Sequence, residues 1–83
     1  MNVVITKHAS ERMAEHGLNQ DEIEAVVRRA IPFAPRWPEA AAALESEVLP
    51  ADPLVKYFSR TAVVTTLLPH GVPLKSDTEV VYV

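Results

Sequence analysis

Two basic side chains, His8 and Arg12, stand four residues apart in a segment that predicts a helix. At this spacing both side chains project from one helix face, one turn apart. A histidine exchanges protons near neutral pH, and an arginine can bind a phosphate group through two parallel hydrogen bonds. The pair is therefore a candidate for acid–base chemistry on a phosphate. Alternatively, it is the polar rim of a helix whose residues Ala9 and Met13 face a core.

Three further side chains with suitable chemistry lie in the second half of the chain: Tyr57, Arg60 and His70. Tyr57 belongs to a strand-like run, Arg60 to the turn that follows, and His70 to a Pro-His-Gly turn. An ordinary structural role fits each position equally well: a strand aromatic, a solvated turn cation and a solvated loop histidine. A shared basic cleft requires that the sheet bring Tyr57 and His70 next to the first helix.

The sequence indicates neither a metal site nor a cofactor site. The chain has no cysteine, which excludes a disulfide, a thiolate nucleophile and a zinc site with sulfur ligands. His8 and His16 are two helical turns apart, too far to share an ion without a third ligand. With two glycines in the whole chain, a glycine-rich phosphate loop is not expected either.

The helix that carries His8 and Arg12 has clear boundaries in the sequence. Thr6 is a candidate N-cap for a helix over 7–16, and Gly17 supplies the left-handed position that ends it.

A second helix follows at once and has the clearest signals in the chain. Asn19 is its candidate N-cap, with Glu22 three residues later as the reciprocal partner of a capping box. Pro32 ends the helix. Two arginines lie in its last turn, where the negative end of the helix dipole stabilises positive charge. Apolar residues at helical spacing predict its buried stripe: Ile23, Val26, Val27 and Ala30.

The rest of the chain predicts one further helix and four strands. Pro38 suits a first helical turn, so the Ala- and Glu-rich stretch after it predicts a third helix over 38–47. Runs rich in β-branched and apolar residues predict the strands, which are Asn2 to Ile5, Leu54 to Ser59, Thr61 to Leu68 and Thr78 to Val83.

This order, β-α-α-(α)-β-β-β, predicts a single α+β domain over residues 1–83. Two or three helices should pack on one face of a small antiparallel sheet of about three or four strands. The last strand, over 80–83, is an exposed edge that could pair with another chain, including a second copy in a homodimer.

Composition restricts the partners of this domain. Eight basic residues against eleven acidic ones give a net charge of −3, which counts against a protein that binds nucleic acid through phosphate contacts. No apolar run approaches the length of a membrane span, and the first residues do not form a signal peptide. We therefore expect a soluble cytoplasmic protein.

The first helix and its flanks resemble an uncharacterised family of small prokaryotic and phage domains. The resemblance rests on the His-Ala-x-x-Arg-Met pattern of residues 8–13, the Gly-Leu turn at 17–18 and the strand Val-Val-Thr-Thr-Leu at 63–67. It covers residues 3–30 closely and 55–71 loosely. These domains look like distant relatives of the RelE and BrnT ribonuclease toxins. The resemblance implies helices packed on an antiparallel sheet and an origin in a phage or another mobile element.

One functional hypothesis follows from that resemblance. In RelE-type toxins a ribose 2′-hydroxyl attacks the adjacent phosphate without a metal ion, while a base removes its proton and cations stabilise the developing charge. The domain would then be an endoribonuclease that acts on RNA. The side chains available for these roles are His8, Arg12, Tyr57, Arg60 and His70.

The favoured hypothesis is a small acidic protein without enzymatic activity that binds a protein partner, as an inhibitor or adaptor. An acidic surface could compete for a basic nucleic-acid site or bind a nucleic-acid-binding protein. Trp37, beside an arginine in a proline-rich loop, could anchor such an interface, although a packing role between helices suits it better. The acidic candidates are Glu11, Glu15, Glu22 and Glu24.

Overall fold

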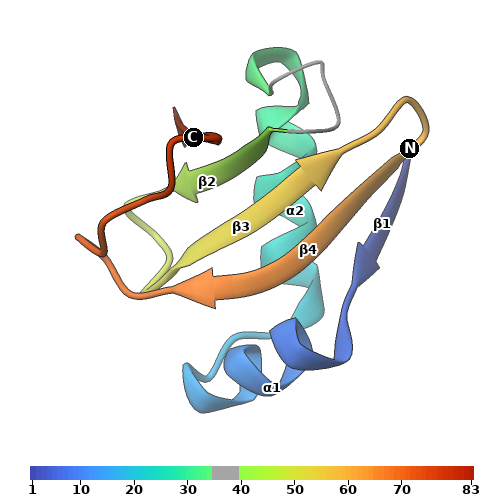
Figure 1. Cartoon of the computed structure of the whole chain (residues 1–83). Coiled ribbons are helices and arrows are strands. Elements are labelled where there is room, and N and C mark those ends of the chain that lie inside the picture. The colour runs from blue at the N-terminus through green and yellow to red at the C-terminus, as the bar shows by residue number, and fades with distance from the viewer. Residues whose placement is uncertain (35–39) are drawn as a thin grey trace.

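The computed structural model describes residues 1–34 and 40–83, so the predicted anchor Trp37 lies outside the described residues. The chain order is β1 (Asn2–Ile5), α1 (Lys7–Glu15), α2 (Gln20–Ala30), a short 3-10 helix (Ile31–Phe33), β2 (Ala41–Glu45), β3 (Asp52–Tyr57), β4 (Thr61–Leu68) and β5 (Thr78–Tyr82). The helices lie on one side of a single five-stranded sheet (Figure 1). The predicted α+β class is thus confirmed.

Both predicted helix starts are confirmed by their caps. The Thr6 hydroxyl accepts the Ala9 N–H at 3.1 Å, and the Asn19 side chain accepts the Glu22 N–H at 2.9 Å. The predicted capping box would have the Glu22 carboxylate accept from the backbone N–H of Asn19. Instead, the carboxylate accepts from the side-chain nitrogen Nδ2 of Asn19 at 3.3 Å.

The end of α1 is also as predicted. Gly17 has a φ of +68°, a conformation that favours glycine. The Gly17 N–H donates to Ala14 and the Leu18 N–H donates to Met13, which is the Schellman arrangement. The chain therefore turns sharply after α1 and enters α2 within a few residues.

The sheet is mixed, where the sequence predicted an antiparallel one. Its strand order is β1-β4-β3-β2-β5, so β1 and β5 are the two edges. The central pairs β2/β3 and β3/β4 are antiparallel, whereas each edge strand runs parallel to its neighbour. Parallel pairing requires a crossover. The connection from β1 to β4 runs through the two helices and then β2 and β3, and the connection from β2 to β5 runs through the β3–β4 hairpin and the loop after it.

The predicted third helix is wrong in the part that the structure describes, because Ala41–Glu45 forms strand β2. Alanine-rich segments prefer a helix locally, but this segment lies inside the sheet, where tertiary packing decides its structure. Residues 40–44 are all apolar and buried there. Ala42 and Leu44 join the core beneath the helices, while Ala41 lines a pocket on the opposite face of the sheet. Leu44 is fully buried in this strand, and Val48 lies exposed in the following loop.

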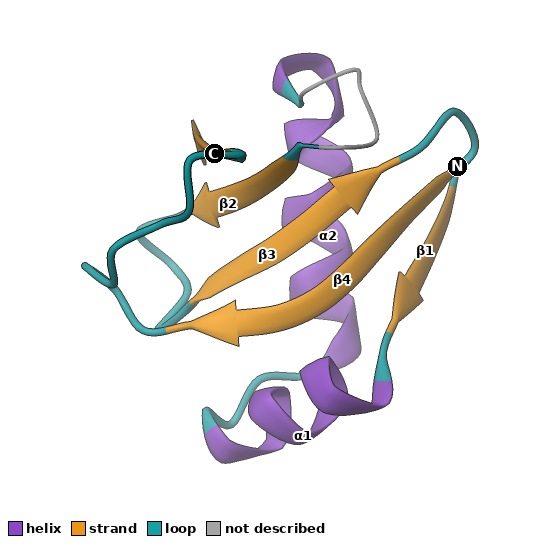
Figure 2. Ribbon diagram, in the orientation of Figure 1, coloured by secondary structure: helices purple, strands orange, loops and turns teal. Residues whose placement is uncertain are grey.

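The core lies between the sheet and the helices, as the separate layers in Figure 2 show. The predicted stripe of α2 is confirmed, since each of its four members is at most 1% exposed. Ala9 and Met13 of α1 belong to the same core. Helix α1 contacts mainly β4, and α2 crosses behind the middle strands.

Candidate functional site

Helix α1 is fixed on β4 at an irregularity of the sheet. Leu54 pairs with Thr66 but Val55 pairs with Val64, so Thr65 is an extra residue in β4. The Thr6 hydroxyl donates to the Thr65 carbonyl at 3.1 Å, which ties the start of α1 to this bulge. The bulge therefore sets where the basic side chains of α1 lie.

His8 and Arg12 project from this helix as predicted, but each has a local partner. His8 Nε2 lies 3.0 Å from the hydroxyl oxygen of Thr66. Arg12 Nη1 lies 2.7 Å from a carboxylate oxygen of Glu15 in an exposed ion pair within the helix. The Arg12 charge is therefore compensated one turn away, which weakens its attraction for a phosphate.

Tyr57 is a core residue rather than the surface or half-buried aromatic that its strand position suggested. Its side chain is 6% exposed, and its hydroxyl donates to the Val27 carbonyl at 2.9 Å. Burial raises the pKa of the Tyr57 phenol well above its usual range, because the phenolate would lose its hydration. In this position the phenol joins β3 to α2 and remains protonated.

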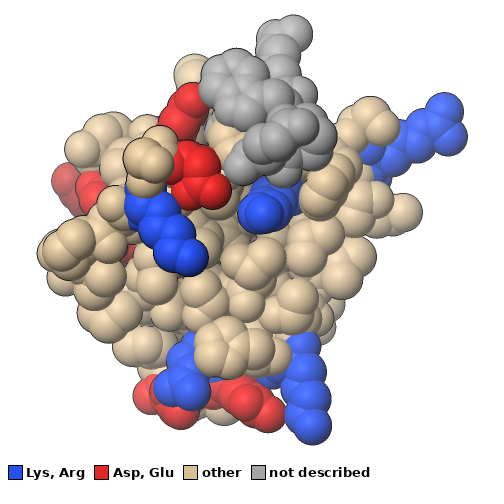
Figure 3. All heavy atoms as spheres, in the orientation of Figure 1, with Lys and Arg blue, Asp and Glu red and all other residues tan. Residues whose placement is uncertain are grey.

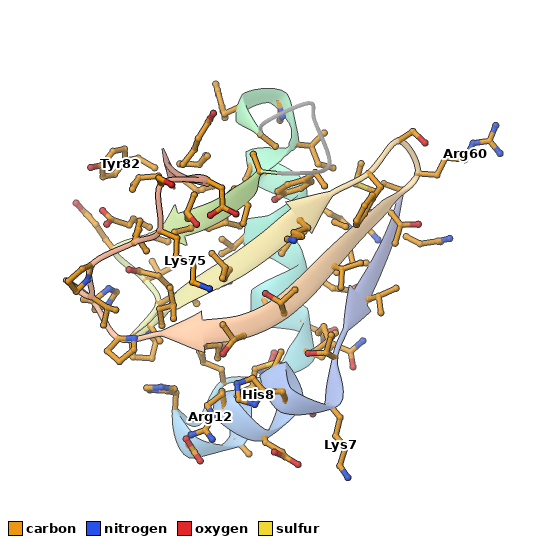
Figure 4. All side chains as sticks on the ribbon, viewed as in Figure 1. Lys7, His8, Arg12, Arg60, Lys75 and Tyr82 are labelled. Carbon is orange, nitrogen blue, oxygen red and sulfur yellow. The ribbon has the colours of Figure 1, made fainter. Side chains whose placement is uncertain are left out.

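Arg60 and His70 do not join His8 and Arg12. Arg60 extends from the β3–β4 turn at the opposite end of the molecule from α1 (Figure 4). His70 follows β4 and contacts the loop between β2 and β3: Nδ1 lies 2.8 Å from an Asp52 oxygen and Nε2 lies 3.0 Å from the Leu49 carbonyl. The five predicted catalytic residues therefore do not converge: His8 and Arg12 share α1, and the other three lie elsewhere in the fold.

Most of the predicted acidic side chains are also engaged locally. Glu15 pairs with Arg12, and Glu24 lies 3.7 Å from Arg28. Glu22 belongs to the Asn19 cap. Of the four glutamates, Glu11 has no hydrogen bond or ion pair to the described residues.

Charges of both signs are interspersed on the face seen in Figure 3. Lysine and arginine side chains there are separated by uncharged surface, and some of them have acidic side chains beside them. Such a distribution does not form the continuous basic surface that phosphate-backbone binding requires. In the described residues, moreover, no group of three His, Asp or Glu side chains is placed to hold a metal ion.

The free edge of β5 is the feature of the fold that is most open to another chain. The Ala41 N–H donates to the Asp77 carbonyl at 3.0 Å, and the Val83 N–H donates to the Glu45 carbonyl at 2.9 Å. In a parallel ladder successive residues alternate in direction, so residues 77, 79, 81 and 83 face β2 and residues 78, 80 and 82 face outward. The sequence predicted this edge, and the structure confirms that β5 is an edge strand.

Val80 and Tyr82 carry most of the unpaired backbone groups of that edge. The Thr78 N–H donates to the Lys75 carbonyl at 3.0 Å, which leaves both groups of Val80 and Tyr82 without a partner among the described residues. Their side chains are exposed as well, Val80 to 39% and Tyr82 to 75%. Natural edges usually carry charges, prolines or bulges, and β5 has none of these at its outward positions.

A groove of about 670 Å³ adjoins the end of β5. Tyr82 and Val83 form one wall, and the loop after β2 forms another with Glu47 and the exposed Val48. His70 and Arg29 complete the lining. Beside the open edge, the groove offers both apolar surface and charges to side chains of an incoming strand.

The other edge is less open. Strand β1 has four residues and leads directly into α1. The Arg28 guanidinium also donates to the Met1 carbonyl at 3.0 Å, at the start of β1. The two edges are therefore not equivalent, and β5 is the longer one.

In the described ranges, 1–34 and 40–83, no helix is long and apolar enough to cross a membrane. Compared with known proteins, the chain matches no family model, no curated protein and no solved structure. The resemblance to the RelE and BrnT toxins therefore stays a prediction.

Proposed function

We propose that this domain is a protein-binding module without catalytic activity, and that it binds an extended segment of its partner along β5. The observation that carries the proposal is the pair of outward-facing residues Val80 and Tyr82, whose N–H and C=O groups have no partner among the described residues. Pairing them with an added strand supplies directional hydrogen bonds, and side-chain contacts supply selectivity.

The proposal agrees with the placement of the other candidate residues. A ribonuclease mechanism needs a base and cations within reach of one phosphate. Here Tyr57 is buried, Arg12 is paired with Glu15, and Arg60 and α1 lie at opposite ends of the molecule. The acidic surface is an equally poor site, because three of its four glutamates have local partners.

Photo-crosslinking tests this function directly. A photoreactive phenylalanine analogue replaces Tyr82 at the open edge or, as a matched aromatic control, Phe58 at the far end of β3. We expect crosslinks to polypeptide from position 82, none from position 58, and loss of the former in a Val80→Pro background. Crosslinks to RNA at either position, or crosslinking from position 82 that is unaffected by Val80→Pro, would contradict the proposal.

A further inference from the structure

We infer that the strand that pairs with β5 is β5 of a second copy of this chain. The two strands run antiparallel, with Val81 on a twofold axis, so that two sheets join into one. This inference rests on the proposed function, because it assumes that the free edge of β5 binds a strand, and it names the partner.

The backbone fits this register. Across an antiparallel pair, residues that face each other through hydrogen bonds exchange both N–H and C=O groups. With Val81 on the axis, Val80 lies opposite Tyr82 of the second copy, and Tyr82 lies opposite Val80 of that copy. Both pairs consist of outward-facing residues, so all the unpaired groups of Val80 and Tyr82 find partners.

The side chains favour the same register. Val80 and Tyr82 of opposite copies form a β-branched–aromatic pair, one of the favourable cross-strand combinations. Val81, which is 6% exposed and belongs to the core, meets Val81 of the second copy and extends the core across the axis. Glu79 lies opposite Val83 in this arrangement, so the Glu79 side chains of the two copies do not face each other directly.

The symmetric register with Val80 on the axis fits less well, both in its side-chain contacts and in its backbone hydrogen bonds. With Val80 on the axis, Glu79 would lie opposite Val81 of the second copy, a valine that is 6% exposed, whereas in the Val81 register Glu79 lies opposite the less buried Val83. Thr78 would lie opposite Tyr82, but its N–H already donates to the Lys75 carbonyl at 3.0 Å. The Val81 register avoids both conflicts.

Twofold symmetry also explains why association would stop at two copies. An antiparallel pair of identical strands uses the same surface on both copies and closes on itself. A pairing of β5 with β1 of the next copy would instead leave one β5 edge and one β1 edge free at the ends and allow open-ended growth. Because β1 is short and partly covered by the Arg28 contact, the closed pairing is favoured.

The absence of cysteine from the chain allows a direct test of the register. In Val81→Cys the two thiols meet across the axis, in the non-hydrogen-bonded position where disulfide geometry can be satisfied. In the control Val80→Cys, each thiol faces Tyr82 instead. We expect mild oxidation to produce a covalent dimer from Val81→Cys and loss of that product in Val80→Cys. A dimer from Val80→Cys in preference to Val81→Cys would overturn the register and the inference.

Sedimentation of the full chain tests the interface independently of any disulfide. The wild type and Val80→Thr, which keeps the outward N–H, should be dimeric, and Val80→Pro should be monomeric. Val80 faces away from β2, so the proline removes no hydrogen bond within the sheet, and circular dichroism checks that the variant is folded. A dimer that persists in folded Val80→Pro would place the interface elsewhere and overturn the inference.

Sedimentation of the wild type and photo-crosslinking from position 82 together separate this inference from the proposed function. If the wild type is monomeric but position 82 crosslinks to a different polypeptide in a Val80-dependent manner, the proposed function stands and the second copy is the wrong partner. If the wild type is monomeric and position 82 crosslinks to no polypeptide, both fail.

Discussion

The imidazole of His70 faces the buried carboxylate of Asp52, with Nδ1 2.8 Å from Oδ1. The other ring nitrogen lies 3.0 Å from the Leu49 carbonyl, so both nitrogens are directed at oxygen atoms that accept hydrogen bonds. This Asp52 oxygen is fully shielded from solvent, and His70 approaches it closely without the alignment of a hydrogen bond. The two contacts of His70 link the turn after β4 to the start of β3 and to the loop after β2, at the wall of the groove beside β5.

Replacing His70 should therefore destabilise the fold. In His70→Ala the Asp52 carboxylate keeps its burial but loses the imidazole nitrogen that lies 2.8 Å from its Oδ1. We expect a loss of about 1 kcal/mol in the free energy of unfolding, because the His70 side chain is 54% exposed and its interaction is partly screened by solvent. Urea denaturation measures the loss. In an Asp52→Asn background the same substitution should cost less, and equal costs in both backgrounds would contradict the charge interaction.

Tyr57 should contribute to stability through the end of α2. The Ile31 N–H donates to the Arg28 carbonyl, so the Val27 carbonyl at the end of α2 has no donor from within the helix. The Tyr57 hydroxyl supplies that donor. Tyr57→Phe removes that donor and keeps the ring. We expect the free energy of unfolding to fall by about 1–2 kcal/mol, measured by urea denaturation. Tyr82→Phe, at an exposed tyrosine, is the control and should leave monomer stability unchanged.

The raised pKa of Tyr57 predicts a loss of stability in alkali. The folded state holds the phenolic proton more tightly than the unfolded state, so above the ordinary tyrosine value the unfolded chain loses its proton first. The stabilisation is complete below that value and is lost as pH rises. We expect the unfolding free energy to fall by about 1.4 kcal/mol per pH unit above pH 10.0 from this group.

Comparison with Tyr57→Phe, both chains carrying Tyr82→Phe, isolates this effect from other groups that titrate in alkali. The stability advantage of the chain that retains Tyr57 should shrink above pH 10.0. An advantage that stays constant with pH would show that the phenol ionises equally readily in both states.

His8 and Arg12 should be dispensable for both folding and binding at β5. The Arg12–Glu15 pair is exposed on both sides, and such pairs contribute little to stability. We expect His8→Ala/Arg12→Ala to change the unfolding free energy by less than about 0.5 kcal/mol and to leave crosslinking from position 82 unchanged. If the wild type cleaves RNA and this variant does not, the ribonuclease hypothesis replaces the proposed function.

The sequence by itself determined the elements whose signals are local. The Thr6 and Asn19 caps, the Gly17 turn and the apolar stripe of α2 depend on residues within one or two helical turns, so their pattern is legible along the chain. Strands β1 and β4 were predicted with the bounds that the structure has, since β-branched residues dominate both.

Only the tertiary structure decided how distant segments combine. A run of alanines favours a helix in isolation, but burial between β3 and β5 makes Ala41–Glu45 a strand. Strand direction depends on which strands become neighbours, so the parallel edges could not be predicted from local pattern. The same long-range packing buries Tyr57, sets His70 against Asp52 and separates Arg60 from His8. Hydrogen bonding and burial between residues far apart in sequence are properties of the folded chain, and they determine which candidate residues remain available for function.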